Sequence, residues 1–462
     1  MDHAADLTPL AGRLVFGHPR GLAYLAGAEL WDRISFHGMQ ALLVLYMVGQ
    51  LLLPGHIEHI VGMATVRRVI EAVTGPLSTQ ALASQIFGLY VGLVYFMPMF
   101  GGMIGDRLLG RTRTITLGAL LMTAGHFCMA FDASFLLAML LLILGAGCLR
   151  GNLAPQVGDL YPKGDRRRDV AFQIYGSMIN LGAFIAPLST GALGQAYGWH
   201  VAFAFAGFGM LFGLIIYLSG RRYLPPEAPR GPLAERRALT PAERRVTLFL
   251  LGLIPINALF WIAQSQVWNT YNIWVRDHVD LKFGTWTMPV VWLQSLDGLS
   301  PFILLPPILI LWRWQARRGG EPNEFTKIAI GCFIFGAATL WLALGQWVTD
   351  ASGRTPLLWA VVFHLVSNLG WLYFTPTVSA LFSRTAPVPI NATIMGVSSL
   401  SVFAGSVVSG RLGGLYEHLP ASQFWALHAG LVTLGGALVL LVGARMRREF
   451  APVTGAEQAS PA

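Results

Sequence analysis

Long apolar stretches recur along the whole chain, and short polar segments separate them. A helix needs about 20 predominantly apolar residues to cross the roughly 30 Å hydrocarbon core of a bilayer. Twelve stretches approach that length, near residues 24–50, 84–105, 114–131, 134–160, 171–196, 199–219, 247–274, 289–312, 326–348, 356–382, 392–416 and 422–444. The pattern predicts an all-α membrane protein with about 12 transmembrane helices.

The composition supports the same prediction. Of the 462 residues, 54% are hydrophobic and only 12% are charged, whereas a soluble domain has about 25% charged residues. Residues 1–20 contain no short apolar core followed by a small-residue cleavage site, so we expect no cleavable signal peptide. Cys128, Cys148 and Cys332 lie in apolar stretches at unpaired spacings. We interpret them as packing thiols and expect no disulfide framework, metal site or cofactor.

The longest polar interruption covers residues 221–245 and contains five prolines. It divides the predicted helices six and six, which is the layout of a transporter with two pseudo-symmetric bundles around a central substrate site. We therefore predict an N-terminal six-helix bundle over 1–220, a cytoplasmic linker over 221–246, a C-terminal six-helix bundle over 247–449 and a disordered tail over 450–462.

The net charge of +9 comes from lysine and arginine clusters in alternate loops and near the C-terminus, at 107–113, 163–168, 221–245, 313–318 and 445–448. The positive-inside rule places such loops in the cytoplasm. The 54–83 loop, with Arg67 and Arg68, departs from this bias. The charge therefore predicts topology, not a nucleic-acid partner. We expect a multi-pass protein of the plasma (bacterial inner) membrane, in contact with membrane lipid and with both termini in the cytoplasm.

The first predicted helix carries charges within its apolar stretch, at Glu29, Asp32 and Arg33. Each charge at the centre of a membrane helix costs about 2.5–3.5 kcal/mol on insertion scales, so such residues face a cavity or one another. Glu29 and Arg33 are spaced i and i+4 and lie on one helix face. The group is interpreted either as a buried ion pair that holds two helices together or as a proton or substrate site in a transport pathway.

A glycine-rich segment with charged residues follows the second predicted helix, at 102–113 (GMIGDRLLGRTR). Its sequence and its position resemble the conserved loop of the major facilitator superfamily. The resemblance implies that Asp106, Arg107 and Arg111 gate one bundle against the other and take no part in substrate chemistry.

Further motifs resemble the proton-dependent oligopeptide transporter family of that superfamily. They are 17–22 (GHPRGL), 29–38 (ELWDRISFHG), 86–90 (IFGLY), 158–161 (GDLY), 165–169 (DRRRD), 179–187 (INLGAFIAP), 198–200 (GWH), Phe260-Trp261, Ser295-Leu296, Pro306, Thr375-Pro376 and Met395-Gly396. The chain is identified as a member of this family on resemblance over nearly its whole length.

The resemblance implies roles for the first-helix residues. Arg33 is expected to meet a substrate carboxylate, and Glu29 and Asp32 are expected to carry the proton-dependent step. The family's tyrosine pair is replaced here by Phe36 and His37. His37 would titrate in the working range because the usual pKa of histidine is near 6.5, although a packing histidine is an equal alternative.

Several other cavity positions depart from the family pattern. Arg150 stands in place of a lysine, and the 260–266 segment lacks the acid with which that lysine pairs. Glu29, Asp32, Asp297 and the substrate are its candidate counter-ions, and we predict Asp297 as its partner across the two bundles, with a helix cap as the alternative role. Trp371 replaces a glutamate expected to hold a peptide amine. Tyr90, Asn180 and Gln266 complete the expected substrate-binding residues implied by the resemblance.

The implied function is proton-coupled symport of di- and tripeptides, or of peptide-like small carboxylates, by alternating access. The departures favour an anionic or amine-blocked ligand on charge grounds. The alternative is uncoupled or exporting transport of a non-peptide organic anion on the same fold. A membrane enzyme or receptor is disfavoured, because no paired catalytic constellation, metal-ligand spacing or soluble domain is found. The expected partners are thus a small-molecule substrate and protons.

Overall fold

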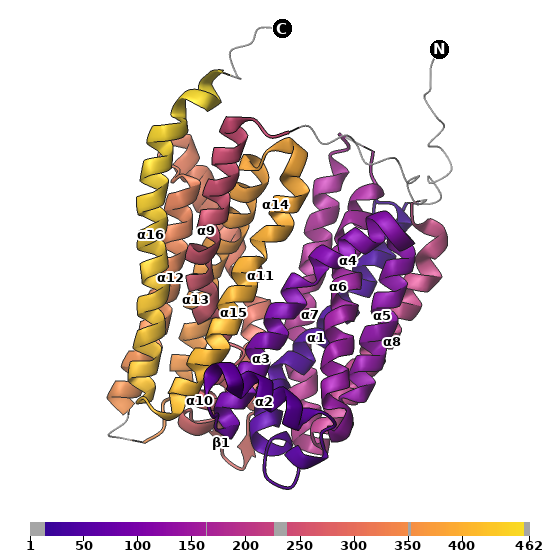
Figure 1. Ribbon diagram of the computed structural model, residues 1–462, viewed down its shortest axis with the longest axis vertical. Coiled ribbons are helices and arrows are strands. Elements are labelled where there is room, and N and C mark those ends of the chain that lie inside the picture. Colours follow the sequence, from indigo (N-terminus) through magenta and orange to yellow (C-terminus); the bar gives the residue numbers. More distant parts are fainter. Residues whose placement is uncertain (1–13, 163, 226–237, 350–352, 457–462) are drawn as a thin grey trace.

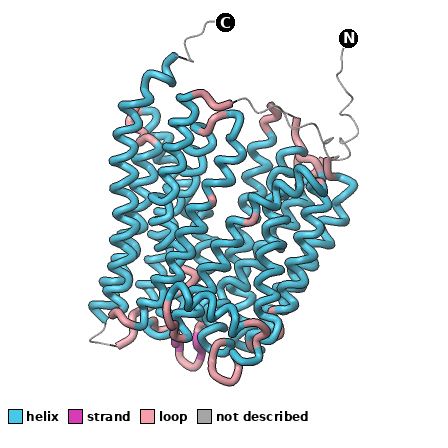
Figure 2. The backbone as a smooth tube through the Cα atoms, in the orientation of Figure 1, coloured by secondary structure: helices cyan, strands magenta, loops and turns pink. Residues whose placement is uncertain are grey.

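The structure is a computed structural model that describes residues 14–162, 164–225, 238–349 and 353–456. Long helices make up almost all of it, and they run roughly parallel to one axis (Figures 1 and 2). The predicted all-α architecture is confirmed. The early and late helices form two neighbouring groups (Figure 1).

The first group holds the helices of the N-terminal half. They are α1 (Arg20–Tyr46), α3 (Thr79–Phe96), α4 (Pro98–Ile104), α5 (Arg111–Cys128), α6 (Phe135–Asp159), α7 (Arg167–Tyr197) and α8 (Trp199–Gly220). α1 packs between α7 and α8, and α5 packs along α6. The start of α1 lies beside the end of α8, where Arg20 donates to the Tyr223 hydroxyl over 3.3 Å.

The second group holds the helices of the C-terminal half. They are α9 (Pro241–Gln266), α10 (Thr270–His278), α11 (Ser295–Arg317), α12 (Glu324–Thr349), α13 (Leu357–Thr385), α14 (Asn391–Ser398), α15 (Leu400–Gly413) and α16 (Ala421–Ala456). α12 packs between α13 and α16. The seventh predicted helix is therefore divided into α9 and α10, and α16 continues beyond residue 449, where the sequence predicted a disordered tail.

Eleven segments of the described chain are long and apolar enough to cross a membrane. Of the twelve predicted stretches, 114–131 is the one with no counterpart among these eleven segments. It corresponds to α5, which packs with α6 and α8 inside the N-terminal group. Arg111 and Arg113 lie in its first turn and His126 in its last, and these three side chains lower its mean hydropathy.

Three small elements outside the bundles were not predicted. The 54–83 loop contains the amphipathic helix α2 (Met63–Thr74), and a hairpin of β1 (Lys282–Phe283) and β2 (Trp286–Thr287) precedes α11. The predicted linker ends earlier than expected, because α9 begins at Pro241 with a capping box between Thr240 and Glu243. Linker residues 226–237 and tail residues 457–462 lie outside the described residues.

The two bundles are joined at one end of the molecule. The hydrogen bonds that cross between them, within the described chain, join α3 to the end of α15 and to Asn269, and α2 to α15. Others join the last part of α1 to α10, and the last part of α7 to the hairpin and to Trp292. Examples are Gln80 to the Gly413 carbonyl at 3.3 Å and Gln195 to the Thr287 carbonyl at 2.9 Å. At the opposite end α4 meets α14, where Gly396 lies beside Met99.

Glycines allow the two bundles to approach closely where α11 crosses α7 and where α3 crosses α15. A Cβ atom at Gly298 of α11 would lie 2.2 Å from the backbone nitrogen of Phe184 on α7, and one at Gly88 of α3 would lie 2.4 Å from the Ser406 carbonyl oxygen on α15. No side chain fits in either place. Such small residues at helix crossings let membrane helices come into backbone contact.

Candidate functional site

A cavity of about 370 Å³ lies between the two bundles. Both bundles contribute polar and aromatic side chains to its wall. The polar and aromatic lining residues are Arg33, His37, Gln40, Phe87, Tyr95, Asn180, Trp261, Gln264, Ser265, Trp268, Asp297, Asn368, Trp371, Thr375, Ser379 and Ser406. A largely apolar wall with a few convergent polar groups is typical of a small-molecule site.

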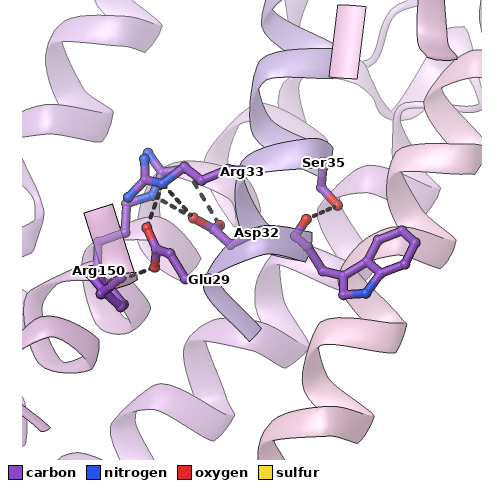
Figure 3. Close-up of polar contacts among 7 residues, drawn as sticks. Glu29, Asp32, Arg33, Ser35 and Arg150 are labelled. Atoms are coloured by element: carbon purple, nitrogen blue, oxygen red, sulfur yellow. Dashed lines mark hydrogen bonds and ion pairs between the residues drawn. The ribbon is translucent and has the colours of Figure 1, made fainter. Parts of the chain in front are cut away.

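The charged residues of α1 form one compact cluster behind this wall (Figure 3). Arg33 Nε donates to Glu29 Oε1 over 2.6 Å and lies 3.6 Å from Asp32 Oδ2. The second oxygen of Glu29 accepts from the Tyr175 hydroxyl of α7 over 2.5 Å. Both carboxylates are fully buried, whereas the Arg33 side chain keeps 13% of its surface exposed. Arg33 is thus the member of the cluster that reaches the cavity.

Arg150 of α6 completes the cluster. Its Nε and Nη2 atoms lie 3.2 and 3.5 Å from the two oxygens of Asp32, in a forked geometry (Figure 3). Its guanidinium carbon lies 3.9 Å from the centre of the Phe36 ring, within cation–π range. Two carboxylates and two guanidinium groups therefore balance each other in a buried place, where an unpaired charge would be costly.

The third acid, Asp297, lies in the first turn of α11 on the opposite wall. Its Oδ1 atom lies 2.7 Å from His364 Nδ1 and accepts from Asn368 Nδ2 over 2.7 Å, and both partners belong to α13. Its Oδ2 atom is buried and has no hydrogen-bond partner among the described residues. The cavity thus has a guanidinium on its N-terminal wall and a carboxylate on its C-terminal wall.

The predicted pairing of Arg150 with Asp297 is wrong for this conformation. Arg150 bonds to Asp32 in its own bundle, and Asp297 bonds to His364 and Asn368 in the other. Asp32 was one of the candidate counter-ions, and it satisfies Arg150 because α6 brings the guanidinium against α1.

The predicted site residues divide into two groups by position. Arg33, His37, Asn180, Asp297 and Trp371 line the cavity. Four others lie away from its wall, namely Phe36, Tyr90, Arg150 and Gln266. The structure therefore does not support direct substrate contact for those four in this conformation.

Gln266 lies on a face of α9 that points away from the cavity. It is fully buried and bonds to the Ser409 carbonyl, to His428 and to Thr270. Gln264 lies two residues earlier and lines the cavity instead. Successive residues of a helix are rotated by about 100°, so two residues apart point to nearly opposite sides.

The sequence analysis did not predict the two partners of Asp297 on α13, His364 and Asn368. The spacing was informative, because His364, Asn368, Trp371 and Thr375 recur at intervals of four, three and four residues in a largely apolar helix. Such a polar stripe on a membrane helix indicates a face turned toward the interior of the bundle.

The predicted gating loop lies at the end of α4. Arg111 Nε donates to Asp106 Oδ1 over 3.2 Å and also contacts Asp159 at the end of α6. Asp106, Arg107 and Asp159 are exposed. The loop is therefore tied to the start of α5 and the end of α6 by surface ion pairs, far from the cavity.

The fold and the site together define a class of protein: a multi-pass membrane transporter of the major facilitator type, with two helical bundles around a polar cavity. A family model, that of the POT family, matches residues 112–238 and 236–427, which is more than half of the chain. The chain belongs to the POT family, as the sequence motifs predicted.

Relatives and solved structures agree over nearly the full length. The chain is 28% identical to an uncharacterized transporter, YclF, of Bacillus subtilis, over 96% of this chain and 97% of the relative. It is also 28% identical to a di-/tripeptide transporter of Lactococcus lactis subsp. cremoris, over 92% and 95%.

Two crystal structures illustrate the shared fold. A peptide transporter POT in complex with sulfate has a TM-score of 0.81 and 26% identity, covering 94% of this chain and 96% of that one. A POT family transporter in complex with a thioalcohol-conjugated peptide has a TM-score of 0.79 and 24% identity, covering 93% and 97%.

Proposed function

We propose that this protein is a proton-coupled symporter of small peptides or peptide-like carboxylates. The observation that carries the proposal is the cavity between the bundles, with Arg33 on one wall and Asp297 on the other. Similarity to peptide transporters supports the substrate class. The protein would act in the bacterial inner membrane, with both termini in the cytoplasm.

Arg33 would bind the substrate carboxylate. Its guanidinium uses Nε for Glu29, and a guanidinium presents its remaining N–H donors as a planar fork that suits a carboxylate. Because Glu29 and Asp32 hold the side chain from behind, its geometry is set before the substrate arrives. Such preorganisation reduces the ordering cost of binding.

The charge of the cavity wall favours a zwitterionic or monoanionic ligand over a multiply charged anion. The sequence suggested an anion-selective pocket with two arginines, but Arg150 is paired with Asp32 away from the wall. Three tryptophans in the wall, Trp261, Trp268 and Trp371, offer aromatic faces on which an ammonium group can lie.

Glu29 and Asp32 would carry protons in the transport cycle. Each carboxylate is balanced by a guanidinium, and the one paired with Glu29 lines the cavity. When a substrate carboxylate engages Arg33, the attraction that keeps Glu29 ionised weakens, so proton uptake by the acid accompanies substrate binding.

The conformation supports alternating access. The bundles are hydrogen-bonded to each other at the end where α3 begins, and the predicted topology places that end outside the cell. The cavity would then exchange with the cytoplasm in this state, and rocking of the bundles about their glycine contacts would expose it to the other side.

Uptake by reconstituted liposomes tests the proposal. Labelled dialanine is supplied outside with an imposed inward proton gradient, and we expect accumulation above the external concentration. Collapse of the gradient by a protonophore should leave only equilibration. Absence of any dialanine transport, together with transport of N-acetylated amino acids or other organic anions, would instead support the alternative substrate class.

A further inference from the structure

A buried acid–histidine pair lies in the wall of the C-terminal bundle. His364 is fully buried on α13, and its Nδ1 atom lies 2.7 Å from Asp297 Oδ1 on α11. Asn368 Nδ2 donates to the same oxygen over 2.7 Å. Two acceptor atoms of the pair, His364 Nε2 and Asp297 Oδ2, are buried with no hydrogen-bond partner among the described residues.

These two atoms define the proton capacity of the pair. With Asp297 ionised and His364 neutral, the Nδ1–H group donates to Oδ1 and the pair has a charge of −1. One added proton, on Nε2 or on Oδ2, makes the pair neutral without breaking either hydrogen bond. Leaving both atoms unprotonated in a buried place costs free energy, so the geometry favours uptake of a single proton.

Among the described residues, no other charged side chain bonds to the pair. Tyr271 of α10 places its ring edge against His364, with the ring centres 5.1 Å apart, and its hydroxyl also has no partner among the described residues. Asn180 of α7 is uncharged, and Arg33 and His37 of α1 face the pair only as part of the shared cavity wall. Lys327 of α12 contacts α11 at Trp312, about four turns from Asp297.

We propose that Asp297 and His364 form a one-proton site in the cavity wall, and that protonation of this site favours binding of a substrate carboxylate. The unprotonated pair presents a net negative charge to the cavity, which repels a carboxylate that approaches Arg33. Protonation removes that repulsion. By linkage, a bound carboxylate then favours the proton to the same degree, and the two are carried together.

This inference rests on the proposed function and adds a specific location for a driving proton in the bundle opposite Arg33. If Asp297 instead bound the substrate amine, the affinity for the substrate would change with pH in the opposite direction. A proton and an ammonium group would compete for Oδ2, whereas a proton and a carboxylate assist each other.

Calorimetric titration of the purified transporter with dialanine measures this coupling. The dipeptide keeps the same charge between about pH 5 and pH 7, because its termini titrate near 3.5 and 8. We expect the affinity of the wild type to rise by about tenfold as the pH falls across this range. Repeating the titration in buffers of different ionisation enthalpy gives the protons taken up per peptide bound.

Two variants locate the proton, and a third serves as the control. Asp297→Asn should lose most of the pH dependence and most of the proton uptake. His364→Gln keeps a donor for Oδ1 but cannot take up a proton, so the midpoint of the pH profile should move. His428→Gln is the matched control, because His428 is also fully buried in the C-terminal bundle but bonds to the Phe424 carbonyl and Gln266, with no carboxylate. Its profile should match the wild type.

Two results would overturn the proposal: affinity that falls as the pH falls, which would place the ammonium group on Asp297, or an unchanged proton uptake in Asp297→Asn. If dialanine does not bind at all, the proposed substrate is wrong, and the proton site is judged separately by the pH dependence of the melting temperature. The site is supported if the pH dependence of the melting temperature differs from the wild type in Asp297→Asn but not in His428→Gln. Identical profiles in all three proteins overturn it.

Discussion

The two walls of the cavity handle buried charge in different ways. On the N-terminal wall two carboxylates face two guanidinium groups, and the Tyr175 hydroxyl occupies the remaining oxygen of Glu29. On the C-terminal wall a single carboxylate, Asp297, has only a histidine and an amide as partners, and one of its oxygens has none among the described residues.

The difference separates two tasks. A balanced cluster fixes a guanidinium in place and resists a change of charge, because removing one partner leaves another buried and unpaired. A carboxylate with neutral partners can gain a proton without disturbing any ion pair. We therefore associate the N-terminal wall with substrate positioning, and with proton uptake only once a substrate carboxylate engages Arg33. The C-terminal wall can load a proton before the substrate binds.

Replacement of Arg33 should have the largest effect. Arg33→Ala removes the only cluster guanidinium that lines the cavity, among the described residues, and leaves the buried Glu29 without a cation. We expect uptake to fall to background and the protein to lose about 3–5 kcal/mol of stability. Uptake assays and thermal melting in detergent measure the two effects. Arg33→Lys keeps the charge and should restore stability more than uptake; full uptake by Arg33→Ala would remove the substrate role.

The Asp32–Arg150 pair should show strong coupling. Asp32→Asn and Arg150→Gln each leave one buried charge unpaired, so each should impair stability and transport. The double variant should be less impaired than the sum of the two, by about 0.5–3 kcal/mol for residues in contact. A parallel cycle with Asp297→Asn and Arg150→Gln should be additive. Coupling in that second cycle instead would indicate that the two residues meet in another state of the transport cycle.

Glu29→Gln should separate coupling from translocation. The amide keeps the size of the side chain and can still bond to Arg33, but it cannot exchange a proton. We expect loss of gradient-driven accumulation with partial retention of peptide exchange across the membrane. Accumulation at the wild-type level would place the driving proton elsewhere, with Asp32 and the Asp297–His364 pair as the remaining candidates.

Tyr175→Phe should have the smallest effect of the four. It removes one hydrogen bond to Glu29 and leaves the ion pairs intact. The expected cost is about 1.5–3 kcal/mol, as for a bond to a charged group, with a modest shift in the pH dependence of uptake. A loss as severe as that of Arg33→Ala would show that the hydroxyl, and not the guanidinium, organises the wall.

The sequence predicted the fold well because membrane helices leave a strong local signal. Twenty apolar residues in a row identify a helix without any tertiary information. The weakest signal was that of α5, where arginines and a histidine lower the hydropathy, although the predicted stretch 114–131 overlaps this helix. The division of the seventh helix between Gln266 and Thr270 carried no comparable signal.

The site was predictable where it is local and not where it depends on tertiary contacts. Glu29 and Arg33 are one turn apart, so their pairing follows from helix geometry. The partner of Arg150 depends on how α6 packs against α1, and the partner of Asp297 on how α11 meets α13. Neither can be read from spacing along the chain. Gln264 and Gln266 differ only in the face they occupy, which the packing of α9 decides.

The most direct test of coupled transport follows the proton itself. Liposomes containing the protein and an internal pH-sensitive dye receive external dialanine without any imposed gradient. Proton-coupled symport predicts acidification of the interior that depends on both dialanine and the protein, that follows peptide entry in time, and that is absent with Arg33→Ala. Entry of labelled dialanine with no change in internal pH would contradict proton-coupled symport.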